Sequence, residues 1–245
     1  MRVLGVITAR GGSKGIPKKN LAPLLGKPLL WYTAKAALEA KSLTRVILST
    51  DDEEIAEVGR QCGVDVPFMR PPELAQDDTP TVPVLQHAVR VLESAGERYD
   101  AICLLQPTNP FRRPEHIDAC VSMLFKRSAD AVVTVLPVPH EYNPHWVYFQ
   151  RKDGSLYLST GEYEPLPRRQ LLPPAFHRDG SVYVMRRDVL MEQGSLYGKK
   201  LLGLLLNPEE SVNIDSPEDL AKAEALARRL LKSNEGHTGC VELQS

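Results

Sequence analysis

The chain opens with an apolar run, Val3-Leu4-Gly5-Val6-Ile7, followed closely by the loop Ala9-Arg10-Gly11-Gly12-Ser13-Lys14-Gly15-Ile16-Pro17-Lys18-Lys19-Asn20. The run has the length and the branched residues of a strand, and a strand that is apolar throughout is buried on both faces, as in a parallel sheet. Ligands of open α/β sheets bind beyond the carboxyl ends of the strands, which is where this loop falls. The stretch therefore predicts an α/β fold with a binding loop after its first strand.

The composition of this loop favours an anion as the ligand. Its three glycines allow backbone N–H groups to turn towards an anion, while one arginine and three lysines can neutralise its charge. The spacing matches neither the Walker sequence Gly-x-x-x-x-Gly-Lys-Ser/Thr nor the dinucleotide fingerprint Gly-x-Gly-x-x-Gly. A solvated loop has a similar composition, so the prediction of a phosphate site depends on the position behind a buried strand.

The composition is that of a globular protein, with 42% apolar and 25% charged residues in 245. A net charge of −1 provides no field for nucleic acid or a membrane surface, and no apolar run approaches the roughly 18 residues of a membrane span. The N-terminus enters a strand rather than a signal peptide. We expect a cytoplasmic protein whose scattered cysteines are mostly buried free thiols: Cys62, Cys103, Cys120 and Cys240.

Alternating strand and helix patterns predict a doubly wound, mostly parallel sheet in a single domain, residues 1–232, followed by a polar, disordered tail, 233–245. The expected strands are 3–7, 45–49, 64–68, 101–105, 131–136, 180–185 and 201–206. The expected helices are 28–40, 51–62, 82–95, 114–126 and one that begins after an N-cap at Ser216. Asp51 follows the second strand and is either a ribose ligand or, with acidic residues behind it, a helix cap.

Two further polar segments lie beside regular elements: residues 106–113 follow a buried strand, and residues 213–215 precede the last helix. In Gln106-Pro107-Thr108-Asn109-Pro110-Phe111-Arg112-Arg113 two prolines restrict the backbone, so polar side chains are held rigidly, as suits reading a base or sugar. A capped turn into the next helix is the alternative. In Asn213-Ile214-Asp215 two oxygen donors point to the same side of an extended chain and can share Mg²⁺; an ordinary polar turn is the alternative.

Residues 137–179 are dense in proline and aromatic residues and interrupt the alternating pattern. Residues 146–150 and 156–158 flank Lys152-Asp153-Gly154-Ser155 and predict a hairpin. Long segments of this kind are uncommon in compact domains unless they are functional. We interpret 137–179 as an insertion that contacts a partner subunit and part of a substrate, with a self-contained surface flap as the alternative.

Taken together, these strings resemble the CMP-sialic acid synthetase family of cytidylyltransferases, over residues 2–231. The resemblance rests on five ordered motifs, which are the first loop to Asn20, Ser49-Thr50-Asp51, Arg70-Pro71-Pro72-Glu73-Leu74-Ala75, Leu105-Gln106-Pro107-Thr108-Asn109-Pro110-Phe111-Arg112 and Asn213-Ile214-Asp215. It implies a homodimer and a reaction in which the anomeric hydroxyl of a 2-keto sugar acid attacks the α-phosphate of CTP and expels pyrophosphate. The Kdo-activating branch carries a different first loop, Ser-x-Arg-Leu-Pro-x-Lys-Pro.

The resemblance also implies roles for individual residues. The triphosphate and base would be held by Arg10, Gly11, Gly12, Ser13, Lys14, Lys19 and Asn20. Cytidine and the neighbouring sugar would be held by Arg70, Thr81, Gln106, Pro107, Thr108 and Arg112. The sugar-acid pocket would contain Gln106, Arg169, Gln170, Phe176 and Tyr183. Mg²⁺ would be bound by Asp215 with Asn213, Lys19 would stabilise the α-phosphate in the transition state, and Arg10 would assist.

Two positions depart from the family pattern. Asn213 stands where sialic-acid enzymes typically have aspartate, which retains an oxygen ligand but loses a charge. Trp146 stands where some members place a lysine against the sugar acid, and an aromatic wall prefers a less polar sugar face. Legionaminic, pseudaminic and Kdo-type acids are therefore alternatives to N-acetylneuraminic acid, and a non-catalytic nucleotide-binding relative is a further one. Lys19 is expected to be an exposed lysine whose loss leaves stability intact.

Overall fold

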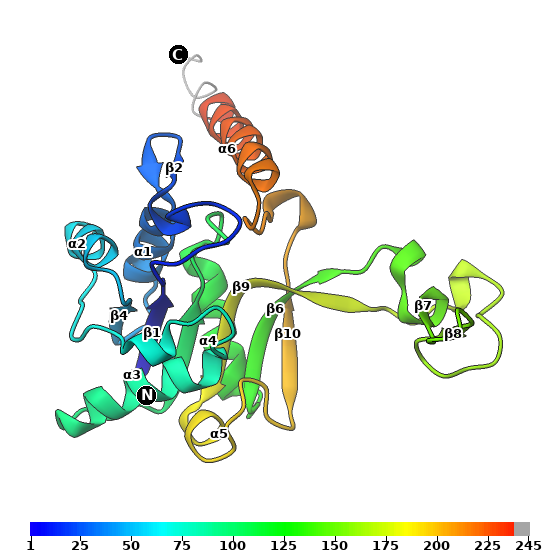
Figure 1. Ribbon diagram of the computed structural model, residues 1–245, viewed down its shortest axis with the longest axis horizontal. Helices are drawn as coiled ribbons and strands as arrows, with labels where there is room; N and C mark the ends of the chain where they lie inside the picture. The colour runs from blue at the N-terminus through cyan, green and yellow to red at the C-terminus, as the bar shows by residue number, and fades with distance from the viewer. Residues whose placement is uncertain (238–245) are drawn as a thin grey trace, which may run out of the picture.

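A computed structural model describes residues 1–237 of the chain, with side chains described as far as residue 230 (Figure 1). At its centre is a six-stranded sheet with the order β10-β6-β9-β5-β1-β4. Its strands are β1 (Val3–Thr8), β4 (Arg45–Ser49), β5 (Ala101–Leu105), β6 (Ala131–Pro137), β9 (Phe176–Arg186) and β10 (Leu201–Leu205). The helices are α1 (Leu29–Glu39), α2 (Glu53–Gln61), α3 (Thr81–Ser94), α4 (Pro114–Lys126), α5 (Arg187–Met191) and α6 (Pro217–His237).

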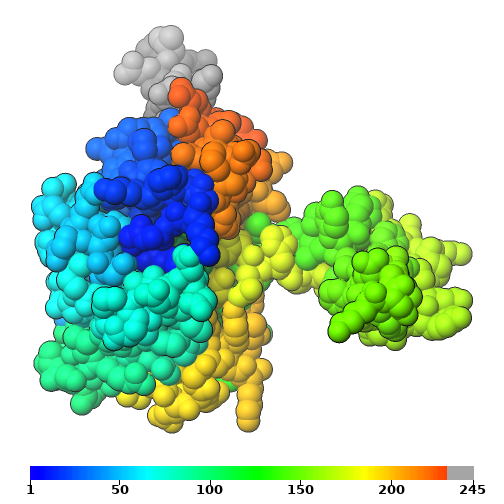
Figure 2. Space-filling model, viewed as in Figure 1, coloured from blue at the N-terminus to red at the C-terminus, as the bar shows by residue number. Residues whose placement is uncertain are grey.

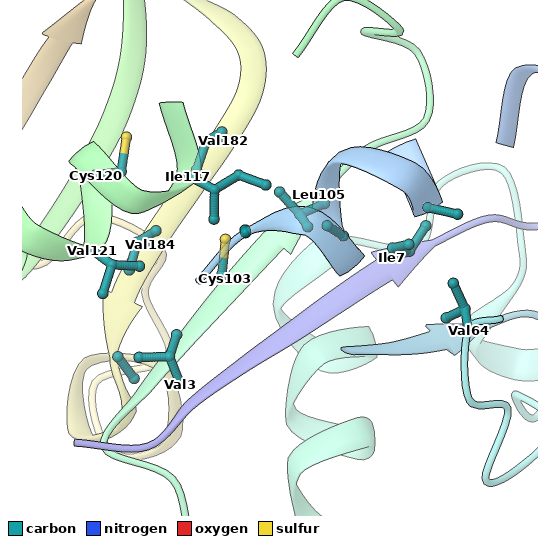
Figure 3. Packing of buried hydrophobic residues seen from close by; sticks show 14 of the residues in the cluster. Val3, Ile7, Val64, Cys103, Leu105, Ile117, Cys120, Val121, Val182 and Val184 are labelled. Atoms are coloured by element: carbon teal, nitrogen blue, oxygen red, sulfur yellow. The ribbon is translucent and has the colours of Figure 1, made fainter. Parts of the chain in front are cut away.

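Alternation along the buried strands places helices on both faces of the sheet. Val3 and Ile7 of β1 pack into one cluster with residues of α1, α2 and α4, whereas Leu4 and Val6 pack into another with α3 and α5. Figure 3 shows the first cluster, in which Cys103 and Cys120 lie among valine and isoleucine side chains. Both thiols are free, and burial raises the pKa of Cys103 to about 12. The predicted doubly wound α/β fold is confirmed.

The sheet is mixed rather than wholly parallel. β9 runs antiparallel to both of its neighbours, β5 and β6, while β1 pairs in parallel with β4 and β5, and β10 with β6. The predicted strand at 64–68 is wrong, because this segment forms one isolated bridge, between Ile47 and Asp65. Pro67 lacks the N–H group that a longer ladder needs, and Val64 alone is fully buried in the segment.

The insertion projects from the body on an arm formed where β6 and β9 extend beyond the sheet (Figure 1). It carries the predicted hairpin, with β7 (Tyr148–Gln150) antiparallel to β8 (Leu156–Leu158). Figure 2 shows a narrow neck between this part and the rest of the molecule. Within it, only Asn143, Leu158 and Asp179 are buried, so the insertion has almost no core of its own.

The last helix, α6, begins as expected. Ser216 and Asp219 form a capping box, with Ser216 N–H donating to Asp219 Oδ2 at 3.1 Å and Asp219 N–H donating to Ser216 Oγ at 3.3 Å. The helix runs five residues past 232, and positions 238–245, which include Cys240 and most of the expected tail, lie outside the described residues. None of the helices within 1–237 combines the length and the apolarity that crossing a bilayer requires.

Candidate functional site

A cavity of about 260 Å³ opens at the carboxyl ends of the parallel strands β1 and β5. The loop after β1 forms one wall, and the loop after β5 and the first turn of α3 form the other. Ten of the predicted residues line it: Arg10, Gly12, Ser13, Lys19, Asn20, Arg70, Thr81, Gln106, Pro107 and Thr108. Segments that are far apart in the sequence thus meet at the expected edge of the sheet.

The loop after β1 is held in place by hydrogen bonds from polar neighbours. Gly11 N–H donates to Asp51 Oδ1 at 3.0 Å, and Asn20 Nδ2 donates to the Arg10 carbonyl at 2.9 Å. The cap of α2, one of the two roles expected of Asp51, is instead formed by Asp52, whose Oδ1 accepts from Ile55 N–H at 3.0 Å. Asp51 is therefore available to orient the loop because the neighbouring aspartate caps α2.

The far end of the chain contacts Lys19 of the cavity wall, although Asn213 and Asp215 do not themselves line the cavity. Lys19 Nζ lies 2.8 Å from Asp215 Oδ1 and 3.1 Å from the Ile214 carbonyl, and Asn213 Nδ2 donates to Asp215 Oδ2. A side chain at Gly15 would place its Cβ 2.1 Å from the Asp215 carbonyl oxygen, so this close approach requires glycine. The Lys19 side chain is only 15% exposed, so the expectation of an exposed lysine is wrong.

Asp77 is a cavity residue that the sequence reasoning missed. Its carboxylate lies 2.8 Å from Arg10 Nη1 and 2.8 Å from Lys14 Nζ, so it pairs with two cations of the glycine-rich loop. A hydrogen bond from Lys14, together with both positive charges, holds the pKa of Asp77 below its ordinary value. The available signal was an acidic pair, Asp77-Asp78, in the polar loop that precedes α3.

Arg70 is a buried cation in the wall of the cavity, with 5% of its surface exposed. Its Nε donates to Ser49 Oγ at 3.1 Å and its Nη2 donates to the Ser49 carbonyl. Burial lowers the pKa of Arg70 to about 10, against the opposing charge of Asp51. The group remains charged at neutral pH and presents its positive field to the cavity.

Arg112 is buried beneath the loop after β5 and lies outside both the first cavity and its neighbour. Its guanidinium donates to the Gln106 carbonyl at 2.7 Å, to Thr33 Oγ1 at 2.9 Å and to the Ser181 carbonyl. Burial lowers the pKa of Arg112 to about 10. With its donors directed at protein groups, Arg112 connects the Gln106 loop to β9 rather than facing a ligand.

A second cavity adjoins the first, since Thr81 and Gln106 line both. Tyr183 of β9 lies here, and burial raises its pKa. The remaining predicted sugar-acid residues, Arg169, Gln170 and Phe176, are exposed on the insertion or its arm and line neither cavity. Residues that the sequence reasoning did not anticipate here include Arg178 and Tyr197.

Asp215 and Asn213 provide the only predicted oxygen donors for a metal ion. The part of the chain that the structure describes contains no cluster of three or more histidine, cysteine, aspartate or glutamate side chains suited to a metal. Mg²⁺ is commonly held by one or two carboxylates together with phosphates of the substrate. One carboxylate and one amide oxygen therefore fit a Mg²⁺ ion that arrives with a triphosphate better than a resident metal.

Comparison with known proteins agrees with this geometry. The fold matches the solved structure of CMP:2-keto-3-deoxy-manno-octonic acid synthetase complexed with CTP, with a TM-score of 0.69 and 19% identity, over 94% of this chain and 100% of that one. A 4-diphosphocytidyl-2C-methyl-D-erythritol synthase from Anaerococcus prevotii matches with a TM-score of 0.66 and 14% identity, over 93% and 96% of the two chains. The chain thus shares the fold of these two synthases.

The sequence comparisons are more specific. A family model described as cytidylyltransferase matches residues 4–237. The CMP-N,N'-diacetyllegionaminic acid synthase of Legionella pneumophila is 35% identical over 92% of this chain and 96% of that protein. N-acylneuraminate cytidylyltransferase A of Danio rerio is 34% identical over 91% of this chain and 50% of the fish protein. The chain belongs to the cytidylyltransferase family, which confirms the resemblance found in the sequence.

Proposed function

We propose that this protein couples CTP to a 2-keto sugar acid of the sialic-acid-like nonulosonic class and releases pyrophosphate. One observation carries the proposal: the cationic loop after β1 and the polar loop after β5 meet around one cavity that adjoins a second, and Lys19 of the first loop contacts Asp215 from the far end of the chain. The arrangement suits two substrates side by side, and relatives that carry such activities in their names match over nearly the whole chain.

In this proposal the first cavity receives CTP. Arg10, Lys14 and Lys19 neutralise the triphosphate, while backbone N–H groups at Gly12 and Ser13 surround it. The rigid loop Gln106-Pro107-Thr108 contacts the nucleoside, and the buried charge of Arg70 adds to the positive field. The pairing of Asp77 with Arg10 and Lys14 must be exchanged for phosphate when CTP binds.

The sugar acid occupies the second cavity, with its anomeric hydroxyl directed across the border at Gln106. The hydroxyl oxygen forms a bond to the α-phosphorus, the bond from that phosphorus to the bridging oxygen of the β-phosphate breaks, pyrophosphate leaves and the hydroxyl proton is released. Lys19, which lies at the junction of the loops, stabilises the negative charge that develops on the α-phosphate. Positioning and charge neutralisation account for most of the catalysis of such transfers.

We propose Asp215 as the protein's carboxylate ligand for Mg²⁺, with Asn213 contributing its amide oxygen once its Nδ2 no longer donates to Asp215 Oδ2. When bound there, Mg²⁺ supplies charge neutralisation and lowers the pKa of the attacking hydroxyl. Lys19 exchanges its bond to Asp215 for a bond to phosphate in the same step. Asn213 has no charge where an aspartate would have one, which weakens the binding of Mg²⁺ by the protein alone. We therefore expect Mg²⁺ to bind together with the nucleotide, which a binding experiment with and without CTP can test.

The insertion is proposed to be the contact between two subunits of a homodimer. Eight of the twelve large hydrophobic side chains that are exposed among the described residues lie between positions 142 and 176. Exposed apolar surface of this extent marks an interface, and a segment without its own core gains most from one. In a dimer, Arg169 and Gln170 of one subunit would reach the second cavity of the other. We place the enzyme in the cytoplasm, where CTP and reduced thiols are found.

The decisive experiment measures pyrophosphate release from CTP and Mg²⁺ with a panel of acids: N-acetylneuraminic, legionaminic, pseudaminic and Kdo. We expect turnover with at least one nonulosonic acid and preference for CTP over UTP, GTP and dTTP, both in turnover and in thermal stabilisation. Silence across the panel with intact CTP binding would instead support a non-catalytic relative, for which Asn213 is the one favourable feature. Equal stabilisation by all four nucleotides would refute the assignment of cytidine.

A further inference from the structure

The second cavity contains an arginine whose charge has no acidic partner. Arg178 lines this cavity together with Gln106, Tyr183 and Tyr197. Its Nη1 donates to the Tyr197 hydroxyl, and its guanidinium carbon lies 5.7 Å from the centre of the Tyr197 ring. Among residues 1–230 no carboxylate pairs with Arg178 within 4 Å. Its positive charge is thus available to a ligand.

A bulge in β9 brings Arg178 into this cavity. Val133 pairs with Tyr183, but Val135, two residues further along β6, pairs with Arg178 rather than with Ser181. Because cross-strand partners point to the same face of a sheet, and Val133 and Val135 share a face, Tyr183 and Arg178 share a face too. In an unbroken strand, residues five apart would point to opposite faces. The bulge thus creates the pair of Arg178 and Tyr183.

Several side chains hold the bulge, so its geometry is a designed feature rather than a frayed end. Gly180 adopts the left-handed φ of 88° that favours glycine. Asn109 Nδ2 donates to the Asp179 carbonyl at 2.7 Å, Arg112 donates to the Ser181 carbonyl, and Val182 N–H donates to Thr134 Oγ1 at 3.0 Å. The loop after β5 therefore positions the bulge as well as Gln106.

The neighbouring carboxylate is directed elsewhere. Asp179 is 94% buried, and its side chain accepts hydrogen bonds from the N–H and the hydroxyl of Ser181 and from the Ser211 hydroxyl at 3.4 Å. It therefore does not neutralise Arg178. A guanidinium that lines a cavity, is held by a tyrosine hydroxyl and has no carboxylate within 4 Å among residues 1–230 is suited to binding a carboxylate in the plane of the fork.

We propose that Arg178, oriented by Tyr197, binds the carboxylate of the sugar acid and so gives the second cavity its preference for acidic sugars. The assignment rests on the proposed function and names the residue that would recognise the carboxylate of its acidic substrate. It differs from the role that the sequence resemblance implies for Arg169: both arginines are exposed, but Arg178 lines the second cavity, whereas Arg169 lies on the insertion and lines neither cavity of its own subunit. Arg178 acts within one subunit, whereas Arg169 needs a partner.

The test compares Arg178→Ala, Arg178→Lys and Tyr197→Phe with the wild type in steady-state pyrophosphate release. For Arg178→Ala we expect the KM of the sugar acid to rise roughly 10- to 100-fold, because a hydrogen-bonded charge pair is lost. The kcat and the KM of CTP should remain unchanged. Arg178→Lys should recover part of the loss because it retains the charge without the fork. Tyr197→Phe should raise the KM less, since it removes only the orienting hydroxyl.

A modified substrate identifies the group that is recognised. The wild type should prefer the free acid over its methyl ester by a factor similar to the effect of Arg178→Ala, whereas Arg178→Ala should barely distinguish the two. If Arg178→Ala retains the full preference for the free acid, another residue binds the carboxylate and the assignment is overturned. A rise in the KM of CTP alone would also overturn it, because Arg178 would then serve the triphosphate.

Controls separate this outcome from misfolding and from failure of the proposed function. Arg2 makes a similar contact at the opposite end of the sheet, where its guanidinium carbon lies 5.1 Å from the centre of the Tyr99 ring. Arg2→Ala should therefore leave every kinetic constant unchanged. CTP binding of each variant reports on the fold. A wild-type enzyme that is silent with all acids refutes the proposed function and this assignment with it, whereas an active wild type with an insensitive Arg178→Ala refutes the assignment alone.

Discussion

The first cavity and the insertion differ in how far their side chains are paired or covered within the chain. Around the first cavity, polar groups are paired within the chain: Arg70 with Ser49, Lys19 with Asp215, and Asp77 with Arg10. In the insertion, aromatic side chains are exposed, and Tyr163 is 98% exposed. The body therefore completes its own site, whereas the insertion has an apolar surface that one subunit leaves uncovered.

This difference indicates that the body and the insertion have separate roles in the proposed function. Nucleotide binding depends on segments that meet at one edge of one sheet, so a single subunit contains all of them. The insertion extends away from the body, so in the proposed homodimer Arg169 and Gln170 would contact the site of the other subunit (Figures 1 and 2). Changes in the body should thus affect CTP or chemistry, and changes in the insertion should affect assembly and the sugar acid.

The largest effect is expected at the junction of the loops. Lys19→Ala should lower kcat roughly 10²- to 10³-fold, because a cation aimed at the transferred phosphate is lost. Since Lys19 is partly buried and bonded to Asp215, the free energy of unfolding should also fall, by about 1 kcal/mol or less. Lys18→Ala is the matched control, because Lys18 is adjacent but pairs with Glu54 outside the cavity. Near-normal turnover of Lys19→Ala would remove this lysine from the mechanism.

The next largest effect should come from the insertion. Phe149 and Leu156 are exposed and lie on opposite faces of the hairpin, since Phe149 pairs with Tyr157 and Leu156 with Gln150. Replacing both with glutamate places a charge on whichever face meets the partner. We expect a monomer by light scattering, with kcat/KM for the sugar acid lowered roughly 10- to 100-fold and an unchanged Kd for CTP.

The control for this variant is Leu38→Glu, which charges an exposed leucine on α1 of the body and should change neither mass nor kinetics. A wild type that is already monomeric, or a charged variant that remains dimeric with full activity, would contradict the role of the insertion. A fall in CTP affinity would show that the two regions are not independent.

A smaller effect of opposite sign is expected at Asp77. Asp77→Asn removes the carboxylate that pairs with Arg10 and Lys14 and that the triphosphate must displace. The Kd of CTP should therefore fall roughly 2- to 10-fold, as measured by calorimetry at fixed ionic strength. Asp78→Asn, one residue along and outside the cavity lining, should leave the Kd unchanged. A weaker affinity for CTP in Asp77→Asn would mean that Asp77 supports the nucleotide instead of competing with it.

The smallest effect concerns stability far from the site. Glu93 accepts two hydrogen bonds from Arg187, at 2.6 and 3.0 Å, and this pairing lowers the pKa of Glu93. A carboxylate with a depressed folded-state pKa adds stability above its unfolded pKa, near 4.5, and this contribution is lost as the pH falls through the lower folded value.

Urea unfolding at several pH values tests this pairing. Glu93→Gln should be less stable than the wild type by on the order of 1 kcal/mol at pH 7, and the difference should shrink below pH 4.5. Turnover should be unaffected because Glu93 lies outside both cavities. A difference that stays constant down to pH 3 would mean that the ion pair does not account for the stability.

The sequence by itself determined the layers of the fold and the positions of the binding loops. The predicted bounds of α4 and of the strands 45–49 and 101–105 coincide with those observed, because strand alternation, helix periodicity and Pro114 at the helix start are local signals. Gly11, Gly12, Gln106 and Asp215 could be found in the same way, since each lies beside an end of a regular element.

Only the tertiary structure decided which of these groups face each other. Asp77 pairs with Arg10 across a sequence separation of 67 residues, and Arg112 faces the protein interior rather than a ligand, neither of which has a local pattern. The bulge that aligns Arg178 with Tyr183 changes a strand's register by three residues, and it is held by Asn109 and Thr134 from elsewhere in the chain. Pairings of this kind depend on how segments pack, which local spacing does not encode.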